Sequence, residues 1–420
     1  MTRFAFLLLC LLVLLPASAL LTHAQVAEQD SLALVTLYNT TDGPNWIGDA
    51  NWLVGPVASW DGVTVDSGRV TVLLLQANAL DGEIPPEIGD LTKLQRLRLF
   101  RNRLSGTIPP ELGNLANLTD LALARNQFVG ALPPELGNLA NLKTLDLAFN
   151  QFTGLLAPEP GDLLNLEVIF LNDNQFSGPI PPQLGNLAAA QTLNLSRNQL
   201  TGAIPPQLGS LDSLTVLDLS FNQLDGAIPP EIGDLAGLQV LWLLANSLTG
   251  PIPPEIGNLA NLTSLLINNT QLTGSLPLNF TNLTSLNTFN FTNTDLCEPA
   301  DAAFQTWLQN VGNVSSTGVT CTATATDDAP VLPTVFALDP GYPNPFNTAT
   351  RIRYALPRAT PVRLSIYDAA GRLVAVPVDA VQPAGWHGVT VEAGVWPSGV
   401  YFYHLEAGTF RATRSLLLLR

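Results

Sequence analysis

Carboxylates are the side chains most able to do chemistry in this 420-residue chain, because its three histidines and three cysteines form no cluster. Paired carboxylates about 5 to 10 Å apart hydrolyse glycosidic bonds. Asp146 and Asp218 occupy one position of a 24-residue repeat, three repeats apart. Strands spaced at about 4.8 Å would separate them by about 14 Å, too far for that mechanism. The sequence also contains no nucleophile elbow and no phosphate-binding glycine loop, so we expect no enzyme, no metal and no cofactor.

Arginine and aromatic side chains offer a second kind of chemistry, the recognition of a ligand at a surface. Five of the nine basic residues within residues 25–338 lie between Lys93 and Arg103. The candidate ligand-binding residues are Arg96, Arg98, Phe100, Arg101, Asp120, Arg125, Asp146, Phe170, Asp218 and Trp242. Alternatively, the arginines only increase solubility, and Phe149 and Phe221, which follow on the same face, pack within turns.

A strict 24-residue period positions these side chains. It is marked by eight asparagines, at Asn78, Asn102, Asn126, Asn150, Asn174, Asn198, Asn222 and Asn246. Leu97 and Leu99 alternate with arginines just before Asn102, which predicts a strand with one buried face. An amide both donates and accepts, so each asparagine is expected to bond backbone groups of its turn and of the neighbouring coil. Such a period indicates a solenoid, in which each repeat buries its apolar face against its neighbours.

Glycine and proline recur with the same period. Gly106 has counterparts from Gly82 to Gly274, which points to a backbone conformation that a Cβ would obstruct. Proline pairs such as Pro109-Pro110 fix φ and predict extended or 3₁₀ backbone on the convex side rather than a long helix. Because these glycines follow the period of the fold, we interpret them as structural.

These residues resemble the plant-type, 24-residue leucine-rich repeat over about residues 69–294, or ten strand-bearing units. The resemblance implies a right-handed, mainly β solenoid with a parallel sheet on its concave side and a short second sheet beside it. Thr270 and Thr294 replace the ladder asparagine and offer fewer hydrogen bonds, so we expect a less regular C-terminal end.

A cap is expected at each end of the solenoid. An N-terminal cap over residues 25–68 should contain a short helix, and it resembles the cap of the same family. Ala58 and Val65 stand in the region where that family usually has cysteines, so the usual cap disulfide is absent. A C-terminal cap over residues 295–322 should contain a helix beginning near Phe304.

The N-terminus has the features of a signal peptide over residues 1–24. Arg3 precedes an apolar run from Phe4 to Leu15 that is too short to span a bilayer comfortably. Cleavage after Ala19 or Ala24 is compatible with the small residues there, and Ala24 is preferred; a membrane anchor is the alternative reading. No later segment is apolar and long enough to span a membrane. Removal of this segment leaves Cys297 and Cys321, and one pair in an exported chain indicates a disulfide.

Charge is unevenly distributed along the chain. Residues 25–338 carry a net charge of −20 and residues 339–420 carry +3. An acidic body repels nucleic acid and anionic membranes, so no nucleic-acid partner is expected. Solubility is the simplest explanation of the negative charge.

The last eighty or so residues follow a polar linker over residues 323–338 and have the alternation of a small antiparallel β-sandwich. Four motifs in order resemble the C-terminal sorting domain of type IX secretion cargo, over residues 339–420. The resemblance implies a Bacteroidetes-group Gram-negative bacterium, transport across the outer membrane by the type IX machinery, then removal of the domain with release or attachment at the cell surface. An inert β-sandwich is the alternative. The motif residues are Tyr342, Pro343, Asn344, Pro345, Phe346, Gly371, Arg372, Ser398, Gly399 and Tyr401.

These features predict an extracellular or outer-membrane-surface protein that binds a protein, peptide or glycan through its concave face. The alternatives are a passive surface spacer without a specific ligand and, more remotely, a hydrolase.

Overall fold

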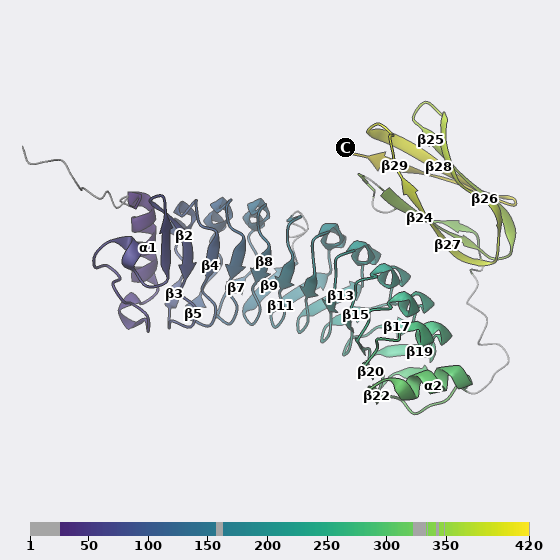
Figure 1. The fold of residues 1–420 in the computed structure, drawn as a ribbon, viewed down its shortest axis with the longest axis horizontal. Coiled ribbons are helices and arrows are strands. Elements are labelled where there is room, and N and C mark those ends of the chain that lie inside the picture. Colours follow the sequence, from purple (N-terminus) through teal and green to yellow (C-terminus); the bar gives the residue numbers. More distant parts are fainter. Residues whose placement is uncertain are drawn as a thin grey trace, which may run out of the picture.

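The computed structural model describes residues 26–156, 163–321, 333, 335–341, 344–347 and 349–419, which form a curved solenoid followed by a β-sandwich (Figure 1). The expected mainly β fold is confirmed. The predicted signal peptide, most of the predicted linker, and the motif residues Tyr342 and Pro343 lie outside the described residues. No helix in the described ranges is long and apolar enough to cross a bilayer.

A 12-stranded sheet forms the concave side of the solenoid. Its ten central strands are parallel, one per predicted repeat, while β1 (Val63–Asp66) pairs antiparallel at one end and β22 (Asn313–Ser315) pairs parallel at the other. Residues 24 positions apart face each other on neighbouring strands, as Leu97 faces Leu121, so each repeat position forms a straight rank across the sheet. The ten strands are β2 (Arg69–Leu74), β4 (Arg96–Arg98), β6 (Asp120–Ala122), β8 (Thr144–Asp146), β10 (Val168–Phe170), β12 (Thr192–Asn194), β14 (Val216–Asp218), β16 (Val240–Trp242), β18 (Ser264–Leu266) and β20 (Thr288–Asn290).

A short second strand follows in each repeat and confirms the expected second sheet. These strands pair in parallel in three separate groups. They are β3 (Asp81–Glu83), β5 (Arg103–Ser105), β7 (Val129–Gly130), β9 (Gln151–Leu155), β11 (Gln175–Pro179), β13 (Gln199–Ala203), β15 (Gln223–Asp225), β17 (Thr249–Gly250), β19 (Gln271–Ser275) and β21 (Asp295–Cys297). Gly106, which directly follows β5, has φ +73°, so the recurring glycine does take a left-handed conformation.

Short 3₁₀ helices lie on the outer side of the bend (Figure 1). In most repeats the helix begins at the second proline of the proline pair, because proline at a first turn sacrifices no helical hydrogen bond. Gly113 lies in the last turn of η4, where an added Cβ would lie 2.3 Å from the carbonyl oxygen of Glu135 in the next coil, so only glycine permits this close approach. The helices are η1 (Gly43–Asn45), η2 (Val57–Ser59), η3 (Pro86–Asp90), η4 (Pro110–Asn114), η5 (Pro134–Asn138), η7 (Pro182–Asn186), η8 (Pro206–Ser210), η9 (Pro230–Asp234), η10 (Pro254–Asn258) and η11 (Leu278–Asn282).

The asparagine ladder joins neighbouring coils. The Asn174 amide nitrogen donates to the carbonyl of Leu147 in the preceding coil (3.0 Å) and to that of Leu171 in its own coil (3.2 Å). Its oxygen accepts from the backbone nitrogen of Phe152 (3.1 Å). The same three bonds recur at Asn102, Asn126, Asn150, Asn198, Asn222 and Asn246. Thr270, by contrast, donates one bond, to the carbonyl of Ile267 (2.8 Å), as its smaller hydrogen-bonding capacity predicts.

The N-terminal cap combines a helix with an aromatic cluster. The helix α1 (Glu28–Thr40) is the one expected in this cap. Its fully buried Asp30 accepts from the guanidinium of Arg69 (2.9 Å) and from the backbone nitrogen of Val70 (2.7 Å), which balances the buried charge. In place of the absent disulfide, four buried rings pack with centroid distances of 4.8 to 5.8 Å; they are Tyr38, Trp46, Trp52 and Trp60.

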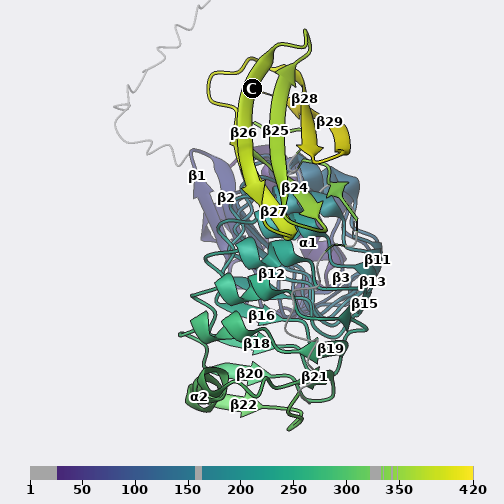
Figure 2. The same ribbon diagram turned by 90° about the vertical axis from the view of Figure 1, so that its right-hand side faces the viewer.

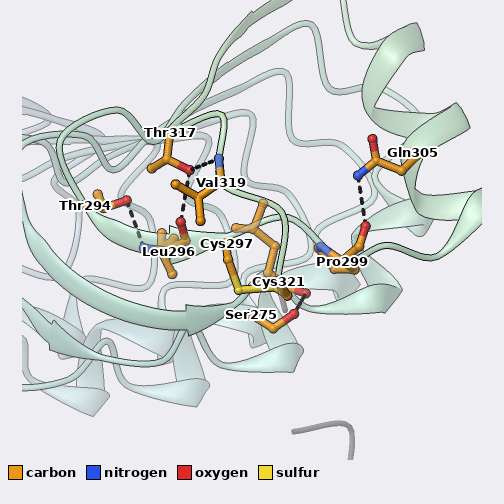
Figure 3. The surroundings of a disulfide bond; sticks show 10 residues. Ser275, Thr294, Leu296, Cys297, Pro299, Gln305, Thr317, Val319 and Cys321 are labelled. Carbon is orange, nitrogen blue, oxygen red and sulfur yellow. Dashed lines mark hydrogen bonds between the residues drawn. A yellow bond between two sulfur atoms is a disulfide. The ribbon is translucent and has the colours of Figure 1, made fainter. Parts of the chain in front are cut away.

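The C-terminal cap contains the expected disulfide between Cys297 and Cys321 (Figure 3). The helix α2 (Ala302–Asn310) begins after Asp301, whose carboxylate accepts from the backbone nitrogen of Phe304 (2.9 Å). Phe304 is fully buried against the last coils, so this helix closes the open end of the core.

The C-terminal unit is the predicted antiparallel sandwich (Figure 2). Its first strand, β23, starts two residues before the predicted boundary at residue 339. One sheet has the order β23-β24-β27 and the other β26-β25-β28-β29. The strands are β23 (Ala337–Leu338), β24 (Ala349–Leu356), β25 (Thr360–Asp368), β26 (Leu373–Gln382), β27 (Gly385–Glu392), β28 (Gly399–Ala407) and β29 (Phe410–Leu418).

The sorting-motif residues that the structure describes have defined places in this sandwich. Asn344 accepts from the backbone nitrogen of Leu417 (2.7 Å) and donates to the carbonyl of Ser415 (2.9 Å), so the motif segment runs beside the last strand. Phe346 is buried in the core. Gly371, Arg372, Ser398 and Gly399 lie in or beside turns, and the Tyr401 hydroxyl donates to the carbonyl of Pro397 (2.7 Å).

The ladder makes a testable prediction about stability. Asn174→Ala leaves two carbonyls and one backbone N–H of a buried turn without their partner, and each such group costs about 1–3 kcal/mol. We expect a loss of more than about 2 kcal/mol, measured as a lower midpoint in urea unfolding. The matched control is Asn165→Ala, because that exposed side chain makes one bond to the carbonyl of Ala140. Equal losses for the two variants would contradict the proposed role of the ladder.

Candidate functional site

The candidate site is the concave face, defined here as the outward side chains of the 12-stranded sheet. Its middle rank follows the strand register from Arg98 in β4 to Asn290 in β20. The register brings five predicted site residues into this one rank, although they are spread over seven coils. These five are Arg98, Asp146, Phe170, Asp218 and Trp242. Neighbours in the rank are about 4.8 Å apart, so a single extended ligand could contact several of them.

An ion pair organises the N-terminal part of this face. The Arg98 Nε donates to Asp120 Oδ2 (2.8 Å), and the two side chains form an ion pair between neighbouring strands. Asp120 is only 8% exposed, and its other carboxylate oxygen is buried without a hydrogen-bond partner among the described residues. Arg98 therefore compensates a buried charge, which leaves the exposed Arg96 as the more available cation.

Asp146 is a half-buried acid in the middle of the face. Burial raises its pKa above the ordinary value, an effect opposed by a hydrogen bond from the backbone nitrogen of Ala148 (3.2 Å) and by the charge of Arg125. The nearby charge of Asp120 raises the pKa further. The carboxylate is therefore held in a position where a cationic or hydrogen-bond-donating ligand group would stabilise it.

Asp218 is used partly by the fold itself. Its Oδ1 accepts from the backbone nitrogen (3.0 Å) and the hydroxyl (2.6 Å) of Ser220. Asn194 makes the same pair of bonds to Ser196 in the neighbouring coil. Asp146 and Asp218 are three strands apart in the sheet, a separation of about 14 Å at strand spacing, as the sequence predicts.

Trp242 provides an apolar platform in the C-terminal half. Its Nε1 donates to the Ser264 hydroxyl on the next strand (2.9 Å), which holds the indole across β16 and β18. Leu244 and Leu266 are neighbours of the ring on the same face, and both are half-buried. Asn268 lies beside them with its Oδ1 buried and without a partner in the described part of the chain. Leu266 and Asn268 are not among the residues predicted from the sequence, although the 24-residue register that identifies Trp242 also identifies them.

The rim of the face is formed by turn residues rather than strand residues. Arg101, Arg125, Phe149 and Phe221 have φ between 53° and 58°, the left-handed region, directly before the ladder asparagines. The guanidinium of Arg125 lies 4.0 Å from the ring centroid of Phe149, and Arg197 lies 4.2 Å from that of Phe221. Both phenylalanines are 40% exposed, so their rings do not pack into the core. Phe100 lies between rim and sheet, half-buried.

Titratable side chains elsewhere in the described part of the chain do not gather into a metal site. Within the described ranges, no group of three or more His, Cys, Asp or Glu side chains could hold a metal ion. His387 and His404 lie in the sandwich, where their ring nitrogens contact the carbonyl of Pro383 (2.9 Å) and the hydroxyl of Thr413 (2.6 Å).

Two family models match the chain. The model described as "Leucine Rich Repeat" matches six segments, and the model described as "Secretion system C-terminal sorting domain" matches residues 341–418. The six segments are residues 93–115, 141–163, 165–187, 190–211, 213–235 and 237–259.

Solved plant proteins have similar structures. A plant ice-binding protein is 30% identical with a TM-score of 0.60, over 71% of this chain and 99% of that protein. The LRR ectodomain of the receptor kinase GASSHO1/SCHENGEN3 from Arabidopsis thaliana, solved in complex with CASPARIAN STRIP INTEGRITY FACTOR 2, is 33% identical with a TM-score of 0.56, over 65% of this chain. A TDR receptor is 33% identical with a TM-score of 0.51, over 56% of this chain. The match spans only 36% and 44% of the two receptor chains.

The raised pKa of Asp146 predicts a pH-dependent contribution to stability. An acid whose pKa is higher in the folded state binds its proton more tightly there, so the folded state loses stability as the pH rises through the interval above the ordinary value of 3.8. Asp146→Asn removes this loss and keeps an oxygen for the backbone nitrogen of Ala148. We therefore expect a higher melting temperature at pH 7, with the gain shrinking in acid. The control is Glu111→Gln on the outer side, and a gain for Asp146→Asn that is independent of pH would refute this assignment.

Proposed function

We propose that this chain, which belongs to the leucine-rich-repeat proteins and ends in a secretion system C-terminal sorting domain, binds a protein, peptide or glycan through its concave face. The sorting domain marks the chain for export by the type IX machinery to the cell surface or extracellular space of a Bacteroidetes-group bacterium. That the chain is not an enzyme stays a prediction.

The observation that carries this proposal is the chemical variety of one straight rank. A cation at Arg98, an acid at Asp146 and an apolar platform at Trp242 follow one another along this rank, and Arg96 lies in the adjacent rank. The solenoid does not need this variety of side chains for its stability, because the buried leucines and the asparagine ladder already hold the repeats together. Arginine and tryptophan are also the residue types that dominate the energy of interfaces.

Two observations favour an extended ligand that carries several hydrogen-bond donors. Among the described residues, buried acceptor oxygens without a partner lie in both halves of the face, on Asp120 and Asn268. An unsatisfied buried acceptor is costly, so a donor from a ligand would be favourable there. The GASSHO1/SCHENGEN3 ectodomain, solved with CASPARIAN STRIP INTEGRITY FACTOR 2, supports the use of this kind of scaffold for binding.

The test replaces Arg96 with Glu and Trp242 with Ala in the full chain. Arg96 is preferable to Arg98, because Arg98→Glu would also place a second acid against the buried Asp120. We expect binding to whole cells or to a matrix extract from the native environment to fall by at least about tenfold, since two interface residues of these types commonly contribute more than 1 kcal/mol each. The control is Arg103→Glu, which belongs to the same basic cluster but lies on the second sheet. Unchanged binding by the double variant would favour the passive spacer.

A second candidate function, ice binding, is favoured by one surface. The outward side chains of β7, β9, β11 and β13 form an array that contains no charged residue, which we call the Gln–Thr face. Its polar members are Gln151, Thr153, Gln175, Ser177, Gln199 and Thr201. Parallel pairing repeats this array at about 4.8 Å, so hydroxyls and amides are presented at regular intervals that could hold ordered water. The similarity to a plant ice-binding protein along 99% of that protein supports this candidate.

Ice binding can be tested by ice-recrystallisation inhibition and thermal hysteresis of the full chain. Thr153→Lys with Thr201→Lys places two bulky hydrated charges in the Gln–Thr face and should abolish any activity found. Gln239→Lys, an exposed change outside that face, should leave it intact. An inactive parent chain would eliminate this candidate without affecting the concave-face proposal.

A further inference from the structure

The sandwich contacts the outer side of the solenoid through opposite charges. Arg351 forms an ion pair with Asp234, and Arg353 Nη1 lies 2.8 Å from Glu231 Oε1. Both arginines lie on β24, and both acids lie on η9. The two views of the fold agree that the sandwich faces the helices of the outer side rather than the concave sheet (Figures 1 and 2).

The spacing of the charges explains why these two units suit each other. Arg351 and Arg353 are alternate residues of one strand, so their side chains point to the same side of the sheet. Glu231 and Asp234 are three residues apart on a 3₁₀ helix, where side chains at that separation lie on one line. The net charge is −20 over residues 25–338 and +3 over residues 339–420, so the two units that meet here carry opposite net charge.

Arg353 is oriented before it meets the acid. Its guanidinium lies 4.2 Å from the ring centroid of Trp386 on the neighbouring strand β27, which fixes the plane of the group. Trp386 keeps 44% of its surface exposed. An arginine stacked on a ring loses less freedom when it pairs, so this side chain is suited to recognise a carboxylate.

The contact also turns part of the sorting motif toward the solenoid. A cleft of about 790 Å³ separates the two units, and the solenoid contributes Pro206, Pro230 and Glu231 to its wall. From the sandwich, Gly341, Asn344 and Pro345 face the same cleft. Asn344 and Pro345 are motif residues that stay exposed, so this part of the motif faces the solenoid across the cleft.

We propose that the solenoid is a docking partner for its own sorting domain. The acidic outer side of the repeats holds the cationic side of β24 and keeps the face that carries Asn344 and Pro345 turned toward the cargo until export. The ion pairs are partly exposed, and such pairs are weak and screened by salt, so the docked state is reversible. A cationic or anionic surface of the secretion machinery can therefore release the domain by competing for one side of these pairs.

The test measures the dimensions of the disulfide-intact full chain by small-angle X-ray scattering. We expect a compact particle at low salt and a larger radius of gyration at 1 M NaCl, where the Debye length is about 3 Å. Arg351→Glu with Arg353→Glu should give the larger particle even at low salt. Adding Glu231→Arg and Asp234→Arg should restore the compact particle, because the pairs are then re-formed with exchanged signs.

Two controls separate docking from general charge effects. Arg363→Glu breaks an ion pair with Asp379 inside the sandwich and should leave the dimensions unchanged. Glu135→Arg changes an acid of the same outer row far from the sandwich and should also have no effect. The proposal would be overturned if the radius of gyration of the full chain changed neither with salt nor in the variant with Arg351→Glu and Arg353→Glu. It would also be overturned if the variant with all four substitutions did not return to the compact particle.

Discussion

Hydrogen bonding of the buried turn is the constraint on which the structure of the solenoid depends. Each coil bends sharply after its long-sheet strand, and the bend leaves carbonyls of two coils and a backbone N–H without partners in regular secondary structure. One amide, such as that of Asn174, satisfies all three. Leaving a buried polar group unpaired costs more free energy than pairing it contributes to stability. A shift in the register between neighbouring coils would break these bonds and is therefore strongly unfavourable. This bonding fixes the 24-residue pairing, and with it the straight ranks of side chains on the concave face.

The same constraint determines which side chains are available to a ligand. The residue before the asparagine must adopt positive φ, so Arg101 and Arg125 are placed at the rim, whatever their chemistry. The residues alternating with the leucines are the ones that remain free to vary. Some of these are used internally, as Asp218 is by Ser220, while Trp242 spans two strands and stays partly exposed. The concave face thus contains two kinds of position: those whose side chains form bonds that the fold uses, and those whose side chains the fold does not require.

The sequence predicted the features that periodicity controls and missed those that depend on single pairs of side chains. A repeated pattern predicted the strands, the asparagine ladder, its weaker bonding at Thr270 and both capping helices. A lone cysteine pair predicted the disulfide. The ion pair of Arg98 with Asp120 could not be predicted, since it depends on which rotamers two non-equivalent residues adopt in adjacent coils. The aromatic cluster at the N-terminal cap was missed for a similar reason, because its rings come from α1 and from separate loops after it.

The solenoid separates its surfaces by geometry, and this separation has a consequence for function. In each coil the concave strand, the second strand and the 3₁₀ helix face different directions, so a substitution on one face leaves the others unchanged. The candidate ligand residues lie on the concave sheet, whereas Glu231 and Asp234, which hold the sandwich, lie on the outer helices. A ligand in the concave face and a sorting domain on the outer side can therefore be bound at the same time without steric conflict. Since each coil contacts only its neighbours, the two faces are coupled only through a rigid core of buried leucines, and we expect little energetic communication between them.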